Sequence, residues 1–442
     1  MEDKLTTFRQ GVHPPELKEL TEQKRIRRMP FPDEVVLPLS QHTGKPAKIL
    51  VEAGDRVERG DKIGEADGFI SAPIHASATG IVKEVGLWPH PSGAYKTAVR
   101  IAVERYSAQT PRGRTVPDWK GLSTQGIRDA VKNAGVVGLG GAAFPTHVKL
   151  TPPEGTKIDL LILNGCECEP YLTSDHRTMA EYPERVMLGT RIMMVCLGVE
   201  KTMIGIEKNK PDAIAAMTAA IPSDLNITIN PLTVKYPQGA EKMLIDALVH
   251  KEVPSGRLPL DTGVVVQNVG SIAAIAEVFE TGLPLVERIV TVTGKGIREP
   301  SNLIVPIGTK LKDLISMCGG LHDDAFEIVF GGPMMGASQA SLDVPLLKGT
   351  SGVVVLSESE CKRAETHSCI RCGHCLDSCP MFLNPQRLGA LAKAGRYEEM
   401  NDDYHLADCM LCGCCSYACP SNIPLSQLFQ LAKVALWKRQ AA

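Results

Sequence analysis

The distribution of cysteine constrains this chain more than any other feature of its sequence. Of 14 cysteines in 442 residues, ten lie in the range 361–419. Cysteines separated by two, two and three residues run from Cys369 to Cys379, directly before a proline, and the same run returns from Cys409 to Cys419. In a chain that we expect to be intracellular, this pattern indicates metal binding or redox chemistry and not a disulfide framework.

The two runs have the spacing of bacterial ferredoxins, in which each run gives three thiolates to one [4Fe–4S] cluster and its fourth thiolate to the other. The pattern predicts that one cluster is held by Cys369, Cys372, Cys375 and Cys419, and the second by Cys409, Cys412, Cys415 and Cys379. Two structural zinc sites are the alternative, but zinc ribbons place paired CxxC elements far apart in sequence. Cys361 and Cys414 fit neither run, and we expect packed or spare thiols there.

The composition excludes several other classes of protein. Lys and Arg number 48 against 50 Asp and Glu, whereas a nucleic-acid-binding protein needs a basic surplus. No apolar stretch is long enough to span a membrane, and the N-terminus lacks the basic-then-apolar order of a signal peptide. We expect a soluble chain with two to four domains, at roughly 100–200 residues each.

Residues 34–120, which follow an N-terminal extension over residues 1–33, alternate short β-rich runs with glycine turns. Strands are expected over Ala47–Val51, Ile63–Ala66, Gly80–Val85 and Ala98–Val103. The pattern resembles the barrel-sandwich hybrid of biotinyl and lipoyl carrier domains, but its hairpin tip, Ala66–Phe69, lacks the lysine that a carrier modifies. We therefore expect a structural or docking role. The basic run Lys24–Arg28 of the extension is expected to be a solvated surface segment, with contact to an acidic partner or lipid headgroup as the alternative.

Residues 121–285 switch to alternating helices and strands. Helices are predicted over Thr124–Ala134, Pro183–Leu197 and Pro211–Ala220, and strands over Ile158–Leu163 and Thr202–Ile206. This alternation indicates a Rossmann-like α/β domain with a largely parallel sheet and ligands near the strand ends. Three parts of it could form one site: a glycine-rich loop at 138–149, a strand end at 164–170, and two segments at 236–242 and 267–270. By itself the loop is weak evidence, because a plain turn explains it equally well.

Together these segments resemble the flavin- and NADH-binding core of the complex I flavoprotein subunit, with its GxGGAxFPTxxK, NxxExEP, GxE and NNV motifs. The resemblance implies FMN contacts from Gly138, Gly140, Gly141, Lys149, Asn164, Glu167, Gly239, Glu241, Asn268 and Val269. It implies a nicotinamide site formed by Phe144, Lys149, Glu169 and Glu241. The chain departs from the family pattern at Cys166, Ala240, Gln267 and Pro152. We therefore expect NADH stacking to differ in detail.

Residues 286–350 resemble the SLBB β-grasp domain that also follows the flavin domain in complex I, and a spacer role is expected for them. The predicted elements are strands over Ile289–Thr293, Asn302–Pro306 and Phe326–Phe330 and a helix over Leu311–Met317. Residues 351–442 are expected to form a ferredoxin-like helical domain around two clusters. Its predicted helices cover Pro385–Met400, with a turn at Gly395, and Pro424–Arg439.

The order of these parts resembles that of the RnfC family, which belongs to the Rnf (also called Rsx) electron transport complexes. The resemblance implies a multidomain α/β and α+β chain that carries two [4Fe–4S] clusters, non-covalent FMN and NAD(H). It implies an NADH-dependent oxidoreductase subunit of an ion-translocating complex, in which electrons pass between NADH, FMN, the clusters and ferredoxin. The chain would lie peripherally on the cytoplasmic face of the bacterial inner membrane, beside integral and ferredoxin-like subunits, without a transmembrane helix of its own.

Two other functions remain open at this point. A soluble cobalamin reductase shares a flavin core, a β-grasp domain and tandem clusters, but its flavin loop lies near the N-terminus. A non-catalytic iron–sulfur adaptor would require the three central segments to be coincidental.

Overall fold

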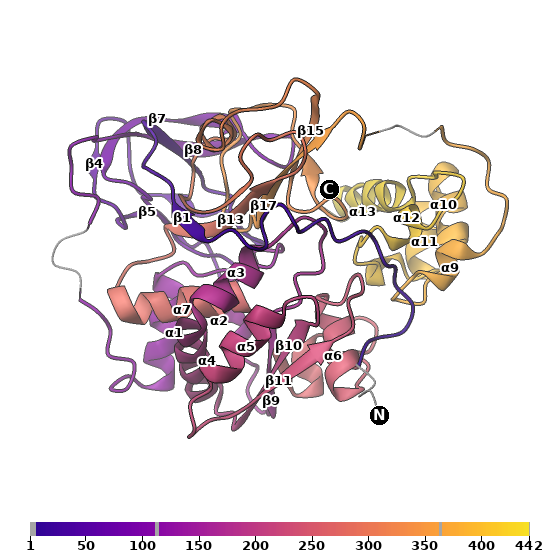
Figure 1. Cartoon of the computed structure of the whole chain (residues 1–442), viewed down its shortest axis with the longest axis horizontal. Helices are drawn as coiled ribbons and strands as arrows, with labels where there is room; N and C mark the ends of the chain where they lie inside the picture. Colours follow the sequence, from indigo (N-terminus) through magenta and orange to yellow (C-terminus); the bar gives the residue numbers. More distant parts are fainter. Residues whose placement is uncertain (1–5, 111–114, 362–364, 442) are drawn as a thin grey trace.

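Four β-sheets and a helical C-terminal part make up the described chain, which comprises residues 6–110, 115–361 and 365–441 of the computed structural model. Figure 1 shows the first two sheets above left, the parallel sheet with its helices below, and the cysteine-rich part on the right. The termini of the chain lie on the side of the cysteine-rich part. This arrangement agrees with the predicted multidomain α/β and α+β fold.

The first two sheets form the predicted barrel-sandwich hybrid. One sheet has the order β2-β8-β7-β4 and the other β3-β5-β6, and every strand pair in them is antiparallel. The strands are β2 (Glu34–Pro38), β3 (Lys48–Ile49), β4 (Arg56–Val57), β5 (Lys62–Glu65), β6 (Ile74–His75), β7 (Gly80–Pro89) and β8 (Tyr95–Val103). The four predicted strands are confirmed, although β7 and β8 form a longer hairpin than the sequence indicated.

The third sheet is parallel throughout, with the order β11-β10-β9-β12. Its strands are β9 (Leu160–Asn164), β10 (Lys201–Glu207), β11 (Asn226–Leu232) and β12 (Val264–Asn268). The helices around it are α1 (Thr124–Asn133), α2 (Thr146–Lys149), α3 (Ser174–Glu181), α4 (Pro183–Leu197), α5 (Pro211–Ala219), α6 (Glu241–Val249) and α7 (Val269–Thr281). The predicted parallel sheet is therefore confirmed, and all strands end on the same edge.

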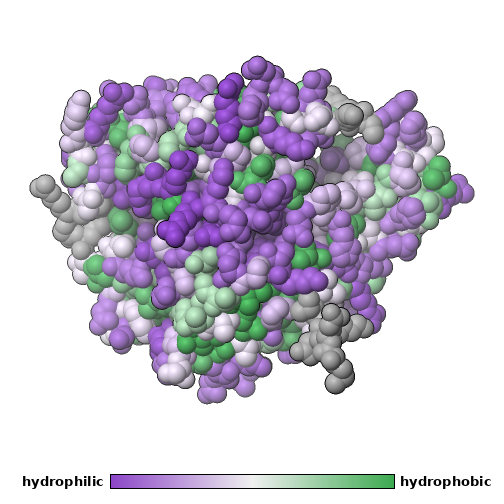
Figure 2. Space-filling model, in the orientation of Figure 1, coloured by the Kyte–Doolittle hydropathy of each residue, from purple (hydrophilic) through white to green (hydrophobic). Residues whose placement is uncertain are grey.

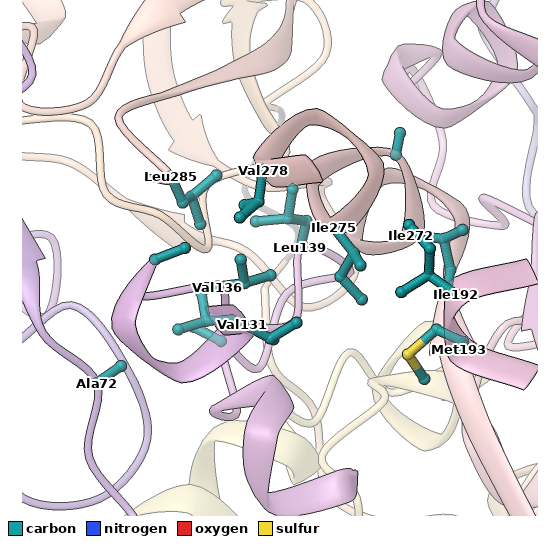
Figure 3. Close-up of a cluster of buried hydrophobic side chains, with 14 of the residues drawn as sticks. Ala72, Val131, Val136, Leu139, Ile192, Met193, Ile272, Ile275, Val278 and Leu285 are labelled. Atoms are coloured by element: carbon teal, nitrogen blue, oxygen red, sulfur yellow. The ribbon is translucent and has the colours of Figure 1, made fainter. Parts of the chain in front are cut away.

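A buried apolar cluster packs the helices of this domain together and reaches the barrel-sandwich hybrid. Figure 3 shows Val131 of α1, Ile192 of α4 and Ile275 of α7 in this cluster, with Ala72 of the barrel part at its margin. Helices α4 and α7 approach very closely, because a Cβ at Gly189 would lie 2.1 Å from a backbone oxygen of α7. The two domains thus share one continuous core.

The fourth sheet, with the order β1-β14-β13-β17-β15-β16, belongs to the β-grasp part. Its elements are β1 (Ile26–Arg28), β13 (Glu287–Thr293), β14 (Ser301–Pro306), α8 (Leu311–Met317), β15 (Ala325–Phe330), β16 (Ala337–Ser338) and β17 (Gly352–Ser357). Strand β17 lies between β13 and β15, although its residues fall in the range 351–442 that we expected for the cysteine domain. We therefore propose a domain boundary after β17.

The basic run of the N-terminal extension is not a free surface segment. Residues Ile26–Arg28 form the edge strand β1, parallel to β14, and Arg28 donates two hydrogen bonds to Glu287. The expectation of a solvated run was wrong because β14 offers an unpaired edge that this segment fills. In Figure 1 the extension, in indigo, runs between the upper sheets and the parallel sheet toward the cysteine-rich part.

The cysteine-rich part is helical, with α9 (His374–Asp377), α10 (Pro385–Lys393), α11 (Tyr397–Asp402), α12 (Cys414–Tyr417) and α13 (Leu425–Ala441). Its core includes Leu388, Met400 and Phe429, each at most 1% exposed. The predicted turn at Gly395 separates α10 from α11. The face in Figure 2 is mostly hydrophilic, with hydrophobic residues scattered in small areas.

Candidate functional site

Two asparagines meet at the edge of the parallel sheet where the predicted flavin site lies. Asn164 ends β9, Asn268 ends β12, and the two are direct partners in the β9–β12 register. Asn164 Nδ2 donates to the Gly239 carbonyl at 2.7 Å. Asn268 Oδ1 accepts from the Ser271 amide at 3.2 Å and so caps α7, where Val269 is the first residue. Three of the predicted segments therefore come together at one strand edge.

The glycine-rich loop lies against the same edge. A Cβ at Gly140 would lie 3.3 Å from the Asn268 side chain, so a larger residue there would displace it. Gly141 has φ +119°, which disfavours any other residue, and nothing lies within 4 Å of its Cβ position. Gly138 donates its amide to the Phe144 carbonyl at 2.8 Å, which closes the loop. The arrangement leaves exposed backbone at residues 140–142, where a ligand can approach closely.

Lys149 and Glu241 form an ion pair across the site, and Lys149 Nζ also donates to the Val266 carbonyl at 3.1 Å. Their side chains remain 26% and 41% exposed. A lysine ammonium, glycine-loop amides and two asparagine amides form a donor set suited to a phosphate and a polar aromatic ring. The residues present therefore fit FMN.

The strand-end loop directs its two carboxylates inward. Glu167, at φ +46°, accepts from the Ser174 hydroxyl and from the amides of Asp175 and His176 at 2.9–3.0 Å, at the start of α3. Glu169 accepts from the amides of Met334 and Met335, at 3.1 and 2.9 Å, in the β-grasp part. The structure thus places these predicted ligand residues in contacts within the protein. Phe144, the remaining predicted nicotinamide residue, is half-buried in the glycine-rich loop.

Two acids of this site have perturbed pKa values. Burial raises the pKa of Glu169 to about 7, although its two amide donors oppose the shift. Burial and the neighbouring Glu167 raise the pKa of Asp175 to about 7, opposed by its hydrogen bond from Asn268. Perturbed carboxyls in one place are typical of a functional site.

Sequence reasoning missed the residue that holds the strand-end loop. Lys18, from the N-terminal extension, is 4% exposed, and its Nζ donates to the carbonyls of Glu167, Glu169 and Leu172 at 2.9, 2.9 and 2.5 Å. Burial lowers the pKa of this ammonium. No local pattern marks Lys18, because its partners lie about 150 residues away in sequence.

The cysteines line two separate cavities. Those of the first, called the outer site here, are Cys369, Cys372, Cys375 and Cys419. Those of the second, called the inner site, are Cys379, Cys409, Cys412, Cys414 and Cys415. The structure thus divides the eight predicted ligands into the two predicted sets, with the fourth cysteine of each run in the other run's cavity. Ligation by these residues stays a prediction.

The backbone of the two runs repeats at equivalent positions. Arg371 and Leu411 have φ +57° and +56°, and Phe382 and Asn422 have φ +54° and +51°. Within the described residues, no three His, Cys, Asp or Glu side chains converge closely enough for a single metal ion. Cysteines that surround a cavity fit a multi-atom iron–sulfur cluster better than a zinc ion.

Family models match four consecutive stretches of the chain. They are the RnfC barrel sandwich hybrid domain over residues 6–105, the Nuo51 FMN-binding domain over 131–277, the SLBB domain over 289–338 and the 4Fe-4S dicluster domain over 365–423. Among solved structures, an NAD+-reducing [NiFe]-hydrogenase in the H2-reduced state has a TM-score of 0.50 at 20% identity, covering 71% of this chain and 64% of that chain. That likeness concerns the fold alone. Fold and site define a flavo-iron–sulfur protein with an FMN-binding and a 4Fe-4S dicluster domain.

Curated relatives place the chain more closely. The RnfC protein of a proton-translocating ferredoxin:NAD(+) oxidoreductase complex from Clostridium ljungdahlii is 46% identical over 404 residues, which cover 91% of this chain and 88% of the relative. Its counterpart in the Na(+)-translocating complex from Acetobacterium woodii is 43% identical and covers 89% of each. The counterpart in the ion-translocating oxidoreductase complex from Haemophilus influenzae is 38% identical, over 98% of this chain and 53% of that protein. The chain belongs to this RnfC family, and it is one component of a complex with several subunits.

None of the helices in residues 6–110, 115–361 and 365–441 combines the length and apolar character needed to span a bilayer.

Proposed function

We propose that this chain is the NADH-binding oxidoreductase subunit of a ferredoxin:NAD(+) complex, and that its electron transfer drives ion translocation by the other subunits. The observation that carries the proposal is the presence, in one chain, of the strand-edge donor set and two four-cysteine cavities. FMN supplies the chemistry that joins them, because a flavin exchanges a hydride with nicotinamide and single electrons with iron–sulfur clusters. The cobalamin reductase and adaptor alternatives lack comparable support, since the barrel-sandwich match precedes the flavin loop.

The chain's own residues bind and orient these groups. The amides of the glycine-rich loop and the ammonium of Lys149 bind the flavin phosphate, while Asn164 and Asn268 present their amides from adjacent strand ends. Glu241, which is the more exposed of the two predicted nicotinamide carboxylates, orients the nucleotide. Glu169 positions the strand-end loop against the β-grasp part through Met334 and Met335.

The cysteine sites hold two [4Fe–4S] clusters within one small helical core, which keeps them near each other for single-electron transfer. The printed names of the two relatives specify different ions, a proton in one and Na(+) in the other, at similar identity to this chain. We infer that other subunits determine the ion. The partners are integral and ferredoxin-like subunits, and the chain lies on the cytoplasmic face of the inner membrane.

An anaerobic titration with NADH tests this function. Protein reconstituted with clusters and FMN is mixed with NADH while visible absorbance is recorded, and we expect the flavin bands to bleach before the broad iron–sulfur absorbance. Lys149→Ala should weaken FMN binding, whereas Lys157→Ala, at a side chain 88% exposed, serves as the matched control. Bleaching by dithionite but not by NADH would show that the chain is reduced by another donor.

A further inference from the structure

One buried tyrosine links the predicted flavin site to the inner cysteine site. Tyr236 is 1% exposed and lies in the 236–242 segment that approaches the strand edge. Its hydroxyl donates to the Cys412 carbonyl at 2.8 Å in a buried hydrogen bond. Cys412 is one of the four cysteines predicted to hold the inner cluster. The hydroxyl therefore reaches a cluster-ligand loop from a different domain.

The backbone around Tyr236 contacts both sites within four residues. The Tyr236 carbonyl accepts from the Val12 amide at 2.9 Å and lies 3.9 Å from Cys414 Sγ. Three residues further on, Gly239 donates its amide to Cys168 Sγ at 3.4 Å and accepts from Asn164 at 2.7 Å. The same short segment thus touches the ligand loop at one end and the flavin strand end at the other.

A loop of the β-grasp part closes this contact from the opposite side. The Met334 amide donates to Glu169, and a Cβ at Gly413, next to Cys412, would lie only 2.9 Å from the Met334 carbonyl. Cys168, Met334 and Tyr236 pack in one apolar cluster with Cys412. The inner ligand loop is consequently enclosed by three parts of the molecule.

The outer site lacks this enclosure. Cys369 and Cys372 are exposed, whereas Cys412 and its neighbours are buried. A Cβ at Gly373, the equivalent of Gly413, would meet nothing within 4 Å. The two sites share a motif but differ in whether the flavin domain contacts them.

We propose that Tyr236 is a positioning residue that holds the inner ligand loop on the flavin strand end and raises the reduction potential of the inner cluster. The inference rests on the proposed function and assigns the inner site as the first acceptor. In that step the reduced flavin loses one electron, the inner cluster gains it, and no atom passes between them. A donor aimed at a ligand residue favours the reduced cluster, because that form carries one more negative charge.

The test compares Tyr236→Phe with Tyr171→Phe, anaerobically and with both cofactors loaded. Tyr171 is a matched control, since its hydroxyl also makes a hydrogen bond, to Glu360 at 2.6 Å, and it is 4% exposed. A redox titration followed by electron paramagnetic resonance reports each cluster separately. A soluble gadolinium chelate identifies the outer cluster, since it relaxes the exposed cluster more strongly.

In Tyr236→Phe we expect the inner cluster alone to become about fivefold harder to reduce, about 40 mV for one electron. Tyr171→Phe should shift neither cluster. An unchanged inner cluster, or a shift confined to the outer cluster, would overturn the proposal. Wild-type protein that binds no FMN or no clusters would instead contradict the proposed function and leave no variant to compare.

A second measurement covers the case in which Tyr236→Phe loads no clusters. Hydrogen exchange is recorded on the wild-type protein with clusters, with and without FMN. We expect FMN to slow amide exchange in residues 409–415 and to leave residues 369–375 unchanged, because only the former contact the flavin strand end through Tyr236. Equal protection of both segments, or of neither, would overturn the proposal.

Discussion

The two cysteine runs have the same spacing and the same backbone conformation, yet they occupy different surroundings. Equivalent positions carry positive φ in both, as Arg371 and Leu411 show. The inner run packs against Tyr236 and Met334 of other domains, whereas the outer run exposes Ile370 at 68%. A motif therefore determines the local ligand geometry, while distant residues determine burial, which in turn sets cluster potential and access.

Removal of one ligand from each run should give the largest difference. Cys372→Ser and Cys412→Ser should each reduce iron from about eight to about four per chain, because one cluster is lost. Cys412→Ser should also release the contact to Tyr236 and lower the thermal midpoint further. Iron analysis and calorimetry measure both effects. Identical thermal midpoints would show that the inner loop adds no stability to the flavin domain.

Alanine at the paired glycines separates backbone strain from crowding. Gly373 and Gly413 have φ +86° and +81°, so each substitution should cost about 1 kcal/mol. Only Gly413→Ala also crowds the Met334 carbonyl, which should add about 1–3 kcal/mol. Hydrogen exchange of residues 369–375 and 409–415 reports the local opening free energies. Equal costs would mean that the β-grasp loop moves aside freely.

The inner side should also respond to pH, since Glu169 faces it from the flavin domain. Burial raises the pKa of Glu169 to about 7 from an ordinary 4.5, so the folded chain holds a proton that the unfolded chain has lost. Stability from this residue is full below about pH 4.5 and falls as the pH rises through about 7. Because Glu169 is only half-buried, we expect a loss of about 1–2 kcal/mol.

Denaturant unfolding of the cluster-free protein between pH 5 and pH 8 would measure this loss. Glu169→Gln cannot titrate and should flatten the curve, while Glu154→Gln is a surface control. A wild-type curve that rises with pH relative to Glu169→Gln would contradict the sign.

Local patterns predicted much of this molecule. Helix α4 was predicted with the bounds that it has, Pro183–Leu197, since proline starts it and glycine ends it. The strand edge followed from the apolar run of β9, and the division of the cysteines into two cavities follows their spacing.

Contacts between distant segments could not be predicted in this way. Lys18 donates to carbonyls about 150 residues away, and β1 fills an edge of β14 that no local pattern reveals. Strand β17 reads equally well as the start of the next domain, because pairing partners leave no mark on a strand's own sequence. The inward direction of the Glu169 carboxylate likewise depends on the Met334 loop, which only the fold brings near.

The smallest effect concerns the one position at which the runs differ in reactive chemistry. His374 is exposed, whereas its equivalent, Cys414, is fully buried with Sγ 3.9 Å from the Tyr236 carbonyl. We expect Cys414→Ala to retain full iron and to cost about 1 kcal/mol for the small cavity, while His374→Ala should stay within about 0.5 kcal/mol of wild type. Iron analysis with urea unfolding measures both. Loss of iron in Cys414→Ala would make this thiol a cluster ligand, and the inner site would then differ from the outer in ligand set as well as in surroundings.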